Sequence, residues 1–377
     1  MSNPVALACL EVWSDLASNS LRFLRPGQYT ILAGFVLHSE DQEDYKCIAL
    51  GSGTKCLSRS QLPSDGSALH DSHAEVIARR NAILWIIREI LECVTRSDYT
   101  SRWLHRSDDG RWRLKDHVQV AMYISTLPCG DASMLSLSLA QDEKMAALKS
   151  SNQSHPLFPG VTLRGRNNYS ALGALRTKPG RADSSASISM SCSDKMASWT
   201  VVGLQGALLA RIMDPVYIDS VVVGDVSQPQ QAQTRIECER AFSLRRPLGD
   251  AMLPYPFQVH APCVDFTDIP FSNGHGQILG NECVSWEAHG CMEVLINGRL
   301  RGFSTKAKTQ KMQGPATCRA SLFALFLRLE PSLQKLSYHE AKLGSLAYQD
   351  SKHILRKEGG PLSGWVVTQE DRDGTTS

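Results

Sequence analysis

The residues best suited to chemistry stand in segment 67–91, which reads SALHDSHAEVIARRNAILWIIREIL. His73 and Glu75 are separated by one residue at the start of an apolar stretch that predicts a helix. Such a pair could supply a metal ligand and an adjacent proton carrier. The alternative is structural, because the sequence from Ser72 to Glu75 also matches the S-x-x-E capping box of a helix start. The H-x-E pattern by itself is too common to decide.

A second candidate ligand is Cys129, in the stretch ISTLPCGDAS, where an apolar strand is expected to give way to a helix. A helix N-terminus favours the thiolate, which is the form of cysteine that binds zinc. Zinc-dependent nucleobase deaminases combine H-x-E with P-C-x-x-C. Here Ala132 stands where that pattern has its second cysteine. A catalytic zinc needs three protein ligands, so the third must come from elsewhere in the chain.

Among the remaining cysteines, Cys192 is the best candidate, because it lies in the polar turn SMSCSDK directly before a predicted helix. Cys56, in the loop GSGTKC, is the second choice. A passive buried thiol is an equally good interpretation of Cys192 taken alone. The same interpretation suffices for cysteines inside predicted helices and strands, which are Cys9, Cys47, Cys93, Cys238 and Cys318.

Composition restricts the class of protein. The chain has 377 residues, of which 42% are hydrophobic, and a net charge of +2, so nucleic-acid binding would depend on local basic patches. No signal peptide and no apolar run of about 18 residues, the length of a membrane span, is recognisable. The odd number of 11 cysteines favours free thiols over disulfides. We therefore expect a location in the nucleus or the cytoplasm, or in both.

Strands alternate with helices along the chain, which predicts an α/β fold with a mixed sheet. We expect a single domain over residues 1–377 with a disordered tail at 368–377, and a hairpin around DDG within 95–117. The expected strands are 30–38, 45–53, 118–126, 216–225, 283–288 and 292–296. The expected helices are 5–24, 74–93, 193–213, 315–329 and 338–357.

Several motifs together resemble one family: GSGTKC, DSHAEVIARR, STLPCGDAS, LRTKPGR, MSCSDKMASWTVVGLQGALL and YHEAKLGSLAYQDSK. They are similar to the catalytic domain shared by RNA-editing and eukaryotic tRNA-specific adenosine deaminases, over about residues 30–366. The resemblance implies a cytidine-deaminase-like mixed β-sheet with helices on both faces, and a C-terminal extension that encloses a polyanion. It also implies that His73, Cys129 and Cys192 bind Zn²⁺ and that Glu75 moves the protons. Water would then replace the amino group at C6 of a flipped adenosine, giving inosine.

The resemblance further implies a buried inositol hexakisphosphate. If 338–357 is one helix, its aromatic and basic residues at 338, 342, 348 and 352 share one face about 120° wide. A solvated cationic face is the alternative. The family pattern is incomplete, because Ser198 and Ala207 replace Arg and Ser, His70 replaces Asn, and Val367-Thr368 replace Glu-Lys. The matching positions are Arg79, Arg80, Lys195, Trp199, Arg319, Tyr338, Lys342, Tyr348, Lys352 and Trp365.

The resemblance also indicates the substrate. The short loop LRTKPGR, and the lack of any Glu between 165 and 190, resemble the tRNA-specific members. We expect deamination of the adenosine immediately 3′ of the anticodon of tRNA-Ala (adenosine 37), with no membrane and no obligate protein partner. A deaminase of double-stranded RNA or of another tRNA site, and an inactive deaminase-like RNA-binding protein, are the alternatives. The expected RNA contacts are Arg176, Lys178 and Arg181.

Further RNA contacts are more open. Thr54 and Lys55 match family residues near the substrate nucleotide, although an ordinary glycine-rich turn explains them equally simply. Arg164 and Arg166 are weaker candidates. The segment 299–319 has six basic residues and no acidic one, so it could neutralise phosphates or be a solvated loop. Its basic residues are Arg299, Arg301, Lys306, Lys308, Lys311 and Arg319.

Overall fold

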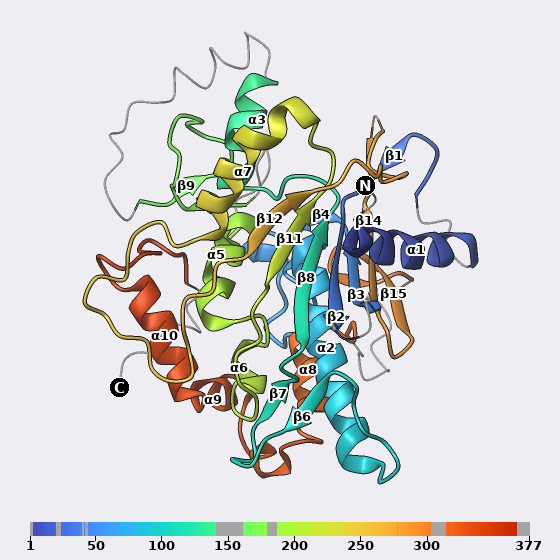
Figure 1. Cartoon of the computed structure of the whole chain (residues 1–377), viewed down its shortest axis with the longest axis vertical. Helices are drawn as coiled ribbons and strands as arrows, with labels where there is room; N and C mark the ends of the chain where they lie inside the picture. Colours follow the sequence, from blue (N-terminus) through green and yellow to red (C-terminus); the bar gives the residue numbers. More distant parts are fainter. Residues whose placement is uncertain are drawn as a thin grey trace.

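An eight-stranded mixed sheet forms the centre of the protein (Figure 1). The computed structural model describes residues 3–19, 24–39, 41, 44–140, 161–178, 187–276, 278–302 and 314–367. The first three strands in the sheet order are parallel to one another, and every later neighbour is antiparallel. In that order the strands are β12 (Cys263–Phe266), β11 (Ser220–Val223), β8 (Val118–Ile124), β2 (Leu32–Ser39), β3 (Asp44–Ser52), β14 (Glu282–Glu287), β15 (Cys291–Ile296) and β16 (Arg299–Leu300).

Helices cover both faces of this sheet, so the predicted mixed sheet with flanking helices is confirmed. Along β8, Val120 and Met122 face one core and Ala121 and Tyr123 face the other, as the two-residue period of a strand requires. The first core is closed by α2 (Ala74–Thr95), α5 (Cys192–Val202) and α7 (Gln228–Phe242). The second is closed by α1 (Pro4–Asn19).

The helix α2 is the central element of the first core. Thirteen of its 22 residues are buried, which explains the many apolar residues in its sequence. Gly51 of β3 allows the close approach, because a Cβ there would lie 2.5 Å from the backbone of Ala74 and Ala78. The N-terminus of α2 is therefore fixed against the sheet, and any side chain at its start is held with it.

Two predicted helices are each broken in two. The helix expected at 193–213 ends at Gly203, whose φ of +68° favours glycine, and α6 (Gly206–Leu209) follows. The helix expected at 338–357 is α9 (Tyr338–Leu343) and α10 (Leu346–Arg356). The break at Ser345 is held because its hydroxyl donates to the carbonyl oxygen of Ala207. The single helix face proposed for residues 338–352 was therefore wrong, because its members lie on two helices.

The remaining elements are short. The predicted hairpin is confirmed as the antiparallel pair β6 (Leu104–Arg106) and β7 (Trp112–Leu114). No helix within the described ranges is both long and apolar enough to cross a membrane. The tail at 368–377 lies outside the described residues. The other strand pairs are β4 (Thr54–Cys56) with β5 (Asp71–His73), β9 (Leu163–Arg164) with β10 (Arg176–Thr177), and β1 (Gln28–Tyr29) with β13 (Ile278–Leu279). The other helices are η2 (Arg59–Gln61), η3 (Asp131–Ser133), α3 (Met134–Leu139), α8 (Arg319–Phe326) and η4 (Pro331–Leu333).

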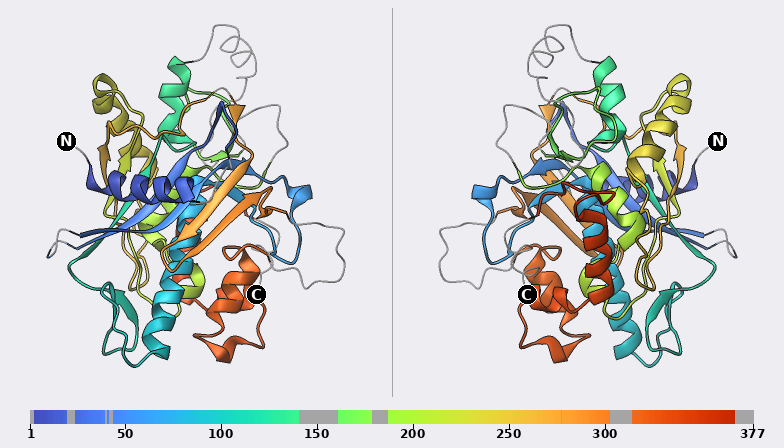
Figure 2. Two further views of the ribbon diagram at one scale, coloured as in Figure 1. Left: turned by 90° about the vertical axis from the view of Figure 1, so that its right-hand side faces the viewer. Right: turned by 90° about the vertical axis from the view of Figure 1, so that its left-hand side faces the viewer.

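The C-terminal helices gather at one end of the molecule. Figure 2 (right) shows α10 beside α5, and a shared apolar cluster containing Ala197, Val201, Tyr348 and Leu355 joins these two helices. The helices α6 and α8 contact α2, and α9 packs against α6 and α8 (Figure 1). Segments far apart in the sequence thus meet around α2 and α5.

Candidate metal centre and adjoining cavity

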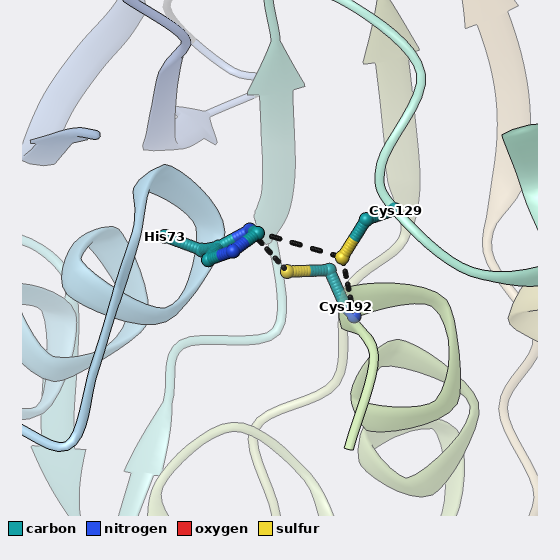
Figure 3. Close-up of side chains that lie close together, drawn as sticks. All are labelled: His73, Cys129 and Cys192. Carbon is teal, nitrogen blue, oxygen red and sulfur yellow. Dashed lines mark hydrogen bonds between the residues drawn. The ribbon is translucent and has the colours of Figure 1, made fainter. Parts of the chain in front are cut away.

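Three side chains converge where α2, α5 and the segment after β8 meet. Figure 3 shows His73, Cys129 and Cys192 pointing toward one another. The Nδ1 atom of His73 lies 3.7 Å from each of the two sulfurs, and all three candidate ligand atoms lie within 4.8 Å of one another. A tetrahedral zinc site with ordinary bond lengths has N···S separations of about 3.6 Å. The three residues therefore fit a metal ion and leave a fourth position for a non-protein ligand.

His73 is the last residue of β5 and the residue before the first turn of α2. Its backbone N–H donates to Asp71 at 3.1 Å. No side chain caps the start of α2. The capping-box interpretation of Ser72 and Glu75 is therefore wrong, and both His73 and Glu75 are available for other contacts.

The two cysteine turns interlock at Gly130. Its φ is +107°, and a Cβ there would lie 2.2 Å from the hydroxyl of Ser191, so only glycine fits. Both the backbone N–H and the hydroxyl of Ser193 donate to the carbonyl oxygen of Cys129 at 3.0 Å. The backbone N–H of Cys192 points at the Cys129 sulfur, 3.4 Å away. The N-terminus of α5 thus faces Cys129, an arrangement that favours a thiolate.

The electrostatics agree with that geometry. A hydrogen bond from Cys192, opposed by burial, holds the pKa of the Cys129 thiol well below its usual value, and the charges of Lys178 and His73 act in the same direction. A metal ion bound between these sulfurs would deprotonate both of them. Cys56 is not part of the group: it lies on β4, 3.1 Å from Ser187, and burial raises its pKa to about 11.

Glu75 lies in the first turn of α2 with 2% of its surface exposed. Burial raises the pKa of Glu75, and the nearby Cys129 sulfur raises it further. A carboxyl group with a raised pKa can both accept and release a proton near neutral pH. Glu75 therefore has the surroundings that a proton carrier needs.

The strand β4 borders the same centre. Thr54 is the direct partner of His73 in the β4–β5 pair, and Lys55 is the partner of Ser72. The Thr54 hydroxyl is buried and has no hydrogen-bond partner within the described part of the chain. A buried hydroxyl in that state indicates a missing polar partner. The prediction that Thr54 and Lys55 contact substrate stays untested.

Two of the RNA contacts predicted in the loop before α5 are buried in the structure. Arg176 is 1% exposed and donates to four backbone carbonyl oxygens within 165–171. Lys178 is 2% exposed and equally enclosed. Neither can reach a phosphate, so the prediction was wrong for both. Arg181 lies outside the described residues, and the exposed Arg164 and Arg166 stay predictions.

Lys178 instead contacts the candidate metal ligand Cys192 in the interior of the protein. Its ammonium group donates to the Cys192 sulfur at 3.1 Å and to Asp71 at 2.7 Å. Asp71 also accepts from Lys195 and, at 2.6 Å, from Ser189. Burial alone would raise the pKa of Asp71, but the two ammonium groups outweigh it and hold the pKa well below its usual range. The sequence offered no signal for this buried chain of charges, because burial of a lysine depends on the tertiary fold.

Lys195 and Asp71 also line a cavity of about 820 Å³ beside the metal group. All ten residues expected to bind a polyanion line this cavity, as do the four departures His70, Ser198, Ala207 and Val367. Thr368 lies outside the described residues. Sequence reasoning missed several basic or polar lining residues, notably Arg59, His339 and Arg356. The described lining contains five arginines, three lysines and one carboxylate, namely Arg59, Arg79, Arg80, Arg319, Arg356, Lys195, Lys342, Lys352 and Asp71.

Arg79 and Arg80 of α2 bring buried guanidinium groups to this cavity. The guanidinium of Arg79 lies 5.0 Å from the Trp199 ring centre, and burial lowers the pKa of both Arg79 and Arg80. The Arg79 Nε and the His339 Nε2 atoms are buried without a hydrogen-bond partner among the described residues. Uncompensated buried charge is costly. The lining therefore fits a ligand with several negative charges.

The chain is similar to known proteins over most of its length. Residues 49–369 match the model of the adenosine-deaminase (editase) domain. The chain is 29% identical to the tRNA-specific adenosine deaminase 1 of Schizosaccharomyces pombe, over 97% of this chain and 95% of that protein. It is 31% identical to the protein of the same name from Drosophila melanogaster, over 93% and 89%. Identity to the double-stranded RNA-specific editase Adar of Drosophila melanogaster is also 31%, but over 62% of this chain and 34% of that protein.

Proposed function

Because this chain belongs to the adenosine-deaminase (editase) family and is an enzyme that acts on adenosine, we propose that it deaminates adenosine to inosine in tRNA by hydrolysis. The observation that carries the proposal is the convergence of His73, Cys129 and Cys192 beside the buried carboxyl group of Glu75. This is the ligand set and the acid–base group that zinc-dependent nucleobase deaminases use.

Zinc is the metal that this ligand set favours, because two thiolates and one imidazole suit it in tetrahedral geometry. When bound, it supplies the Lewis acidity that makes water nucleophilic near neutral pH. The three side chains hold the metal, and the Lys178 ammonium group donates to the Cys192 sulfur, which reduces the negative charge of the ligand set.

Glu75 carries the protons of the reaction. Its buried carboxylate accepts one proton of the attacking water and delivers it to the ring nitrogen N1 of the purine. It then carries the proton of the hydroxyl group added at C6 to the amino group, which leaves as ammonia. Thr54, opposite His73 across the β4–β5 pair, offers an unpaired hydroxyl to the flipped nucleotide. Lys55, the next residue of this strand, is proposed to contact the RNA near the same nucleotide.

The share of each relative's length that aligns with this chain supports a tRNA substrate. The alignments with the two tRNA-specific relatives span 95% and 89% of those proteins, against 34% of the editase Adar. We assign the adenosine immediately 3′ of the anticodon of tRNA-Ala as the target. An unpaired loop base costs less to flip than a base inside a duplex. The whole chain would then act as one catalytic domain.

Inositol hexakisphosphate is the proposed ligand of the cavity. Among the described residues of the lining, five arginines and three lysines accompany one carboxylate, and this composition suits a ligand with several negative charges. Bound there, the polyanion would be connected to the metal centre through Lys195, Asp71 and Lys178.

The test is an inosine assay on two RNAs. Purified protein is incubated with a tRNA-Ala transcript and with a long RNA duplex, and inosine is located by sequencing. We expect inosine at one anticodon-loop adenosine and none in the duplex. Inosine in the duplex alone would contradict the tRNA assignment. Binding of tRNA without inosine in either RNA would favour an inactive RNA-binding protein.

A further inference from the structure

Each of the two candidate cysteine ligands is followed, two residues later, by a buried aspartate. The sequences are Cys129-Gly130-Asp131, the Cys129 turn, and Cys192-Ser193-Asp194, the Cys192 turn. Both aspartates are completely buried. A carboxylate in the interior is costly unless hydrogen bonds and a positive charge compensate it. The partners of these aspartates therefore show what holds the two turns in place.

Asp131 joins the Cys129 turn to α7. One of its oxygens accepts a hydrogen bond from the Nε atom of Arg240, in the last turn of α7, at 2.8 Å. The other accepts from the backbone N–H of Gly173 at 2.7 Å. Arg240 also forms an ion pair with Glu237, one turn earlier on α7. The guanidinium group is therefore held between a carboxylate of its own helix and the carboxylate of η3.

Asp194 joins the Cys192 turn to the end of the same helix. Its carboxylate accepts a hydrogen bond from Arg245 at 3.3 Å. The Arg245 side chain is 5% exposed, and its Nη1 atom donates to the carbonyl oxygens of Arg240 and Ala241 at 2.6 Å. The last carbonyl oxygens of a helix have no partner within it. Arg245 therefore binds both the C-terminus of α7 and the Cys192 turn.

The helix α7 thus contacts both cysteine turns. It packs against η3, which begins in the Cys129 turn, and against α5, which begins in the Cys192 turn (Figure 1). Figure 3 shows the two cysteine side chains approaching from separate segments. The distance between their sulfurs therefore depends on how these segments are held together. Ser193 links them directly, and α7 links them again through charged groups, whose hydrogen bonds are stronger than those between neutral groups.

We propose that Arg240 is a positioning residue of the metal centre, which acts through Asp131 and sets the separation of the two cysteine turns. This inference rests on the proposed function, because it assumes that the cysteines and His73 bind a metal ion. Arg240 touches neither the metal nor the substrate in this assignment. Loss of a group that orients metal ligands typically lowers metal affinity by about 10-fold to 100-fold.

The first test measures the zinc affinity of the purified full chain by competition with a chromophoric chelator. Arg240→Gln should weaken zinc binding by about 10-fold or more. Arg235→Gln is the matched control, because Arg235 lies on the same helix but pairs with Asp265 of β12. The control should change the affinity by about twofold or less. Equal affinities for the two variants would overturn the assignment.

Cobalt(II) gives a second readout, which a loss of stability alone would not change. When it is loaded in place of zinc, its visible absorption bands depend on its coordination geometry. The bands of Arg240→Gln should be shifted from those of the wild type, because the sulfurs are held differently, whereas those of Arg235→Gln should match. Partial unfolding would lower the amplitude of the spectrum without moving its bands. Bands at wild-type positions in Arg240→Gln would contradict a positioning role.

A double variant covers the case in which Arg240→Gln does not fold. The single change leaves the buried Asp131 carboxylate without its ion pair, whereas Asp131→Asn combined with Arg240→Gln leaves no unpaired charge. The double variant should bind zinc about 10-fold more weakly than the wild type, since neutral partners hold the turn less strongly. Wild-type affinity in the double variant would overturn the inference. A wild-type protein that binds no metal would instead remove the metal site from the proposed function.

Discussion

The metal centre and the cationic cavity share α2, yet they differ in how far the protein compensates their charge. In the metal centre each sulfur accepts a hydrogen bond: Cys129 accepts from the backbone N–H of Cys192, and Cys192 accepts from the Lys178 ammonium group. In the cavity, buried Arg79 and His339 nitrogens have no hydrogen-bond partner within the described part of the chain. The first region is preorganised by the protein. We expect the second to depend on a bound anion to balance its charge.

The contrast indicates a division of labour. The protein holds the metal ligands in place without a further ligand. Loss of one of them should therefore lower catalytic activity more than it lowers the stability of the fold. A cavity of like charges stores repulsion that an anion relieves, so loss of the anion should affect stability most. The buried link through Lys178 and Asp71 joins the two and should show both effects.

The largest effect is expected from breaking the metal centre itself. Cys192→Ser should lower bound zinc from about one per chain to a small fraction, since one of only three protein ligands is lost. Deamination should fall in parallel. Zinc is measured by atomic emission on purified protein, and Cys56→Ser, which lies outside the group, should keep full zinc. Full zinc in Cys192→Ser would exclude Cys192 as a ligand.

Glu75→Gln should separate metal binding from proton transfer. The amide cannot carry the proton, so deamination should fall by at least about 100-fold, the usual contribution of general acid–base catalysis. Zinc should stay bound, because Glu75 is not one of the three converging ligands. The exposed Glu11→Gln serves as the control. Turnover within a few-fold of wild type would show that another group moves the proton.

Lys178→Met tests the link between the two regions. It leaves the buried Asp71 with Lys195 as its remaining ammonium partner, and loss of one member of a buried ion pair typically costs roughly 3–5 kcal/mol. The free energy of unfolding is measured in urea, with the exposed Lys335→Met as control. A variant as stable as the control would mean that Asp71 is fully compensated by Lys195 and Ser189.

The smallest effect is expected at the surface. Arg166 is exposed, so Arg166→Gln should weaken tRNA binding only a few-fold and reduce the slope of log affinity against log salt by about 1 if it contacts one phosphate. Zinc content and stability should not change. An unchanged salt slope would remove Arg166 from the tRNA interface.

Local pattern was enough to predict much of the fold. Runs of apolar residues predicted the helix α2 and the strands β2, β3, β8, β14 and β15. These elements are present in the structure because each packs against a core. Two helices were predicted as longer than they are. Gly203 ends the first of them because its backbone has a positive φ. Ser345 interrupts the second through a hydrogen bond to Ala207, which lies 138 residues away in the sequence.

The sequence by itself determined the chemical set: an imidazole, two thiols and a carboxylate with the motifs that resemble one family. Only the tertiary structure decided which groups are buried together, because burial and approach depend on the sheet that brings α2 and α5 side by side. It moved Arg176 and Lys178 from the expected RNA surface into the interior, where backbone carbonyls and Asp71 satisfy them. It also added Arg356 to the cavity, since a helix break at Ser345 sets the direction of α10.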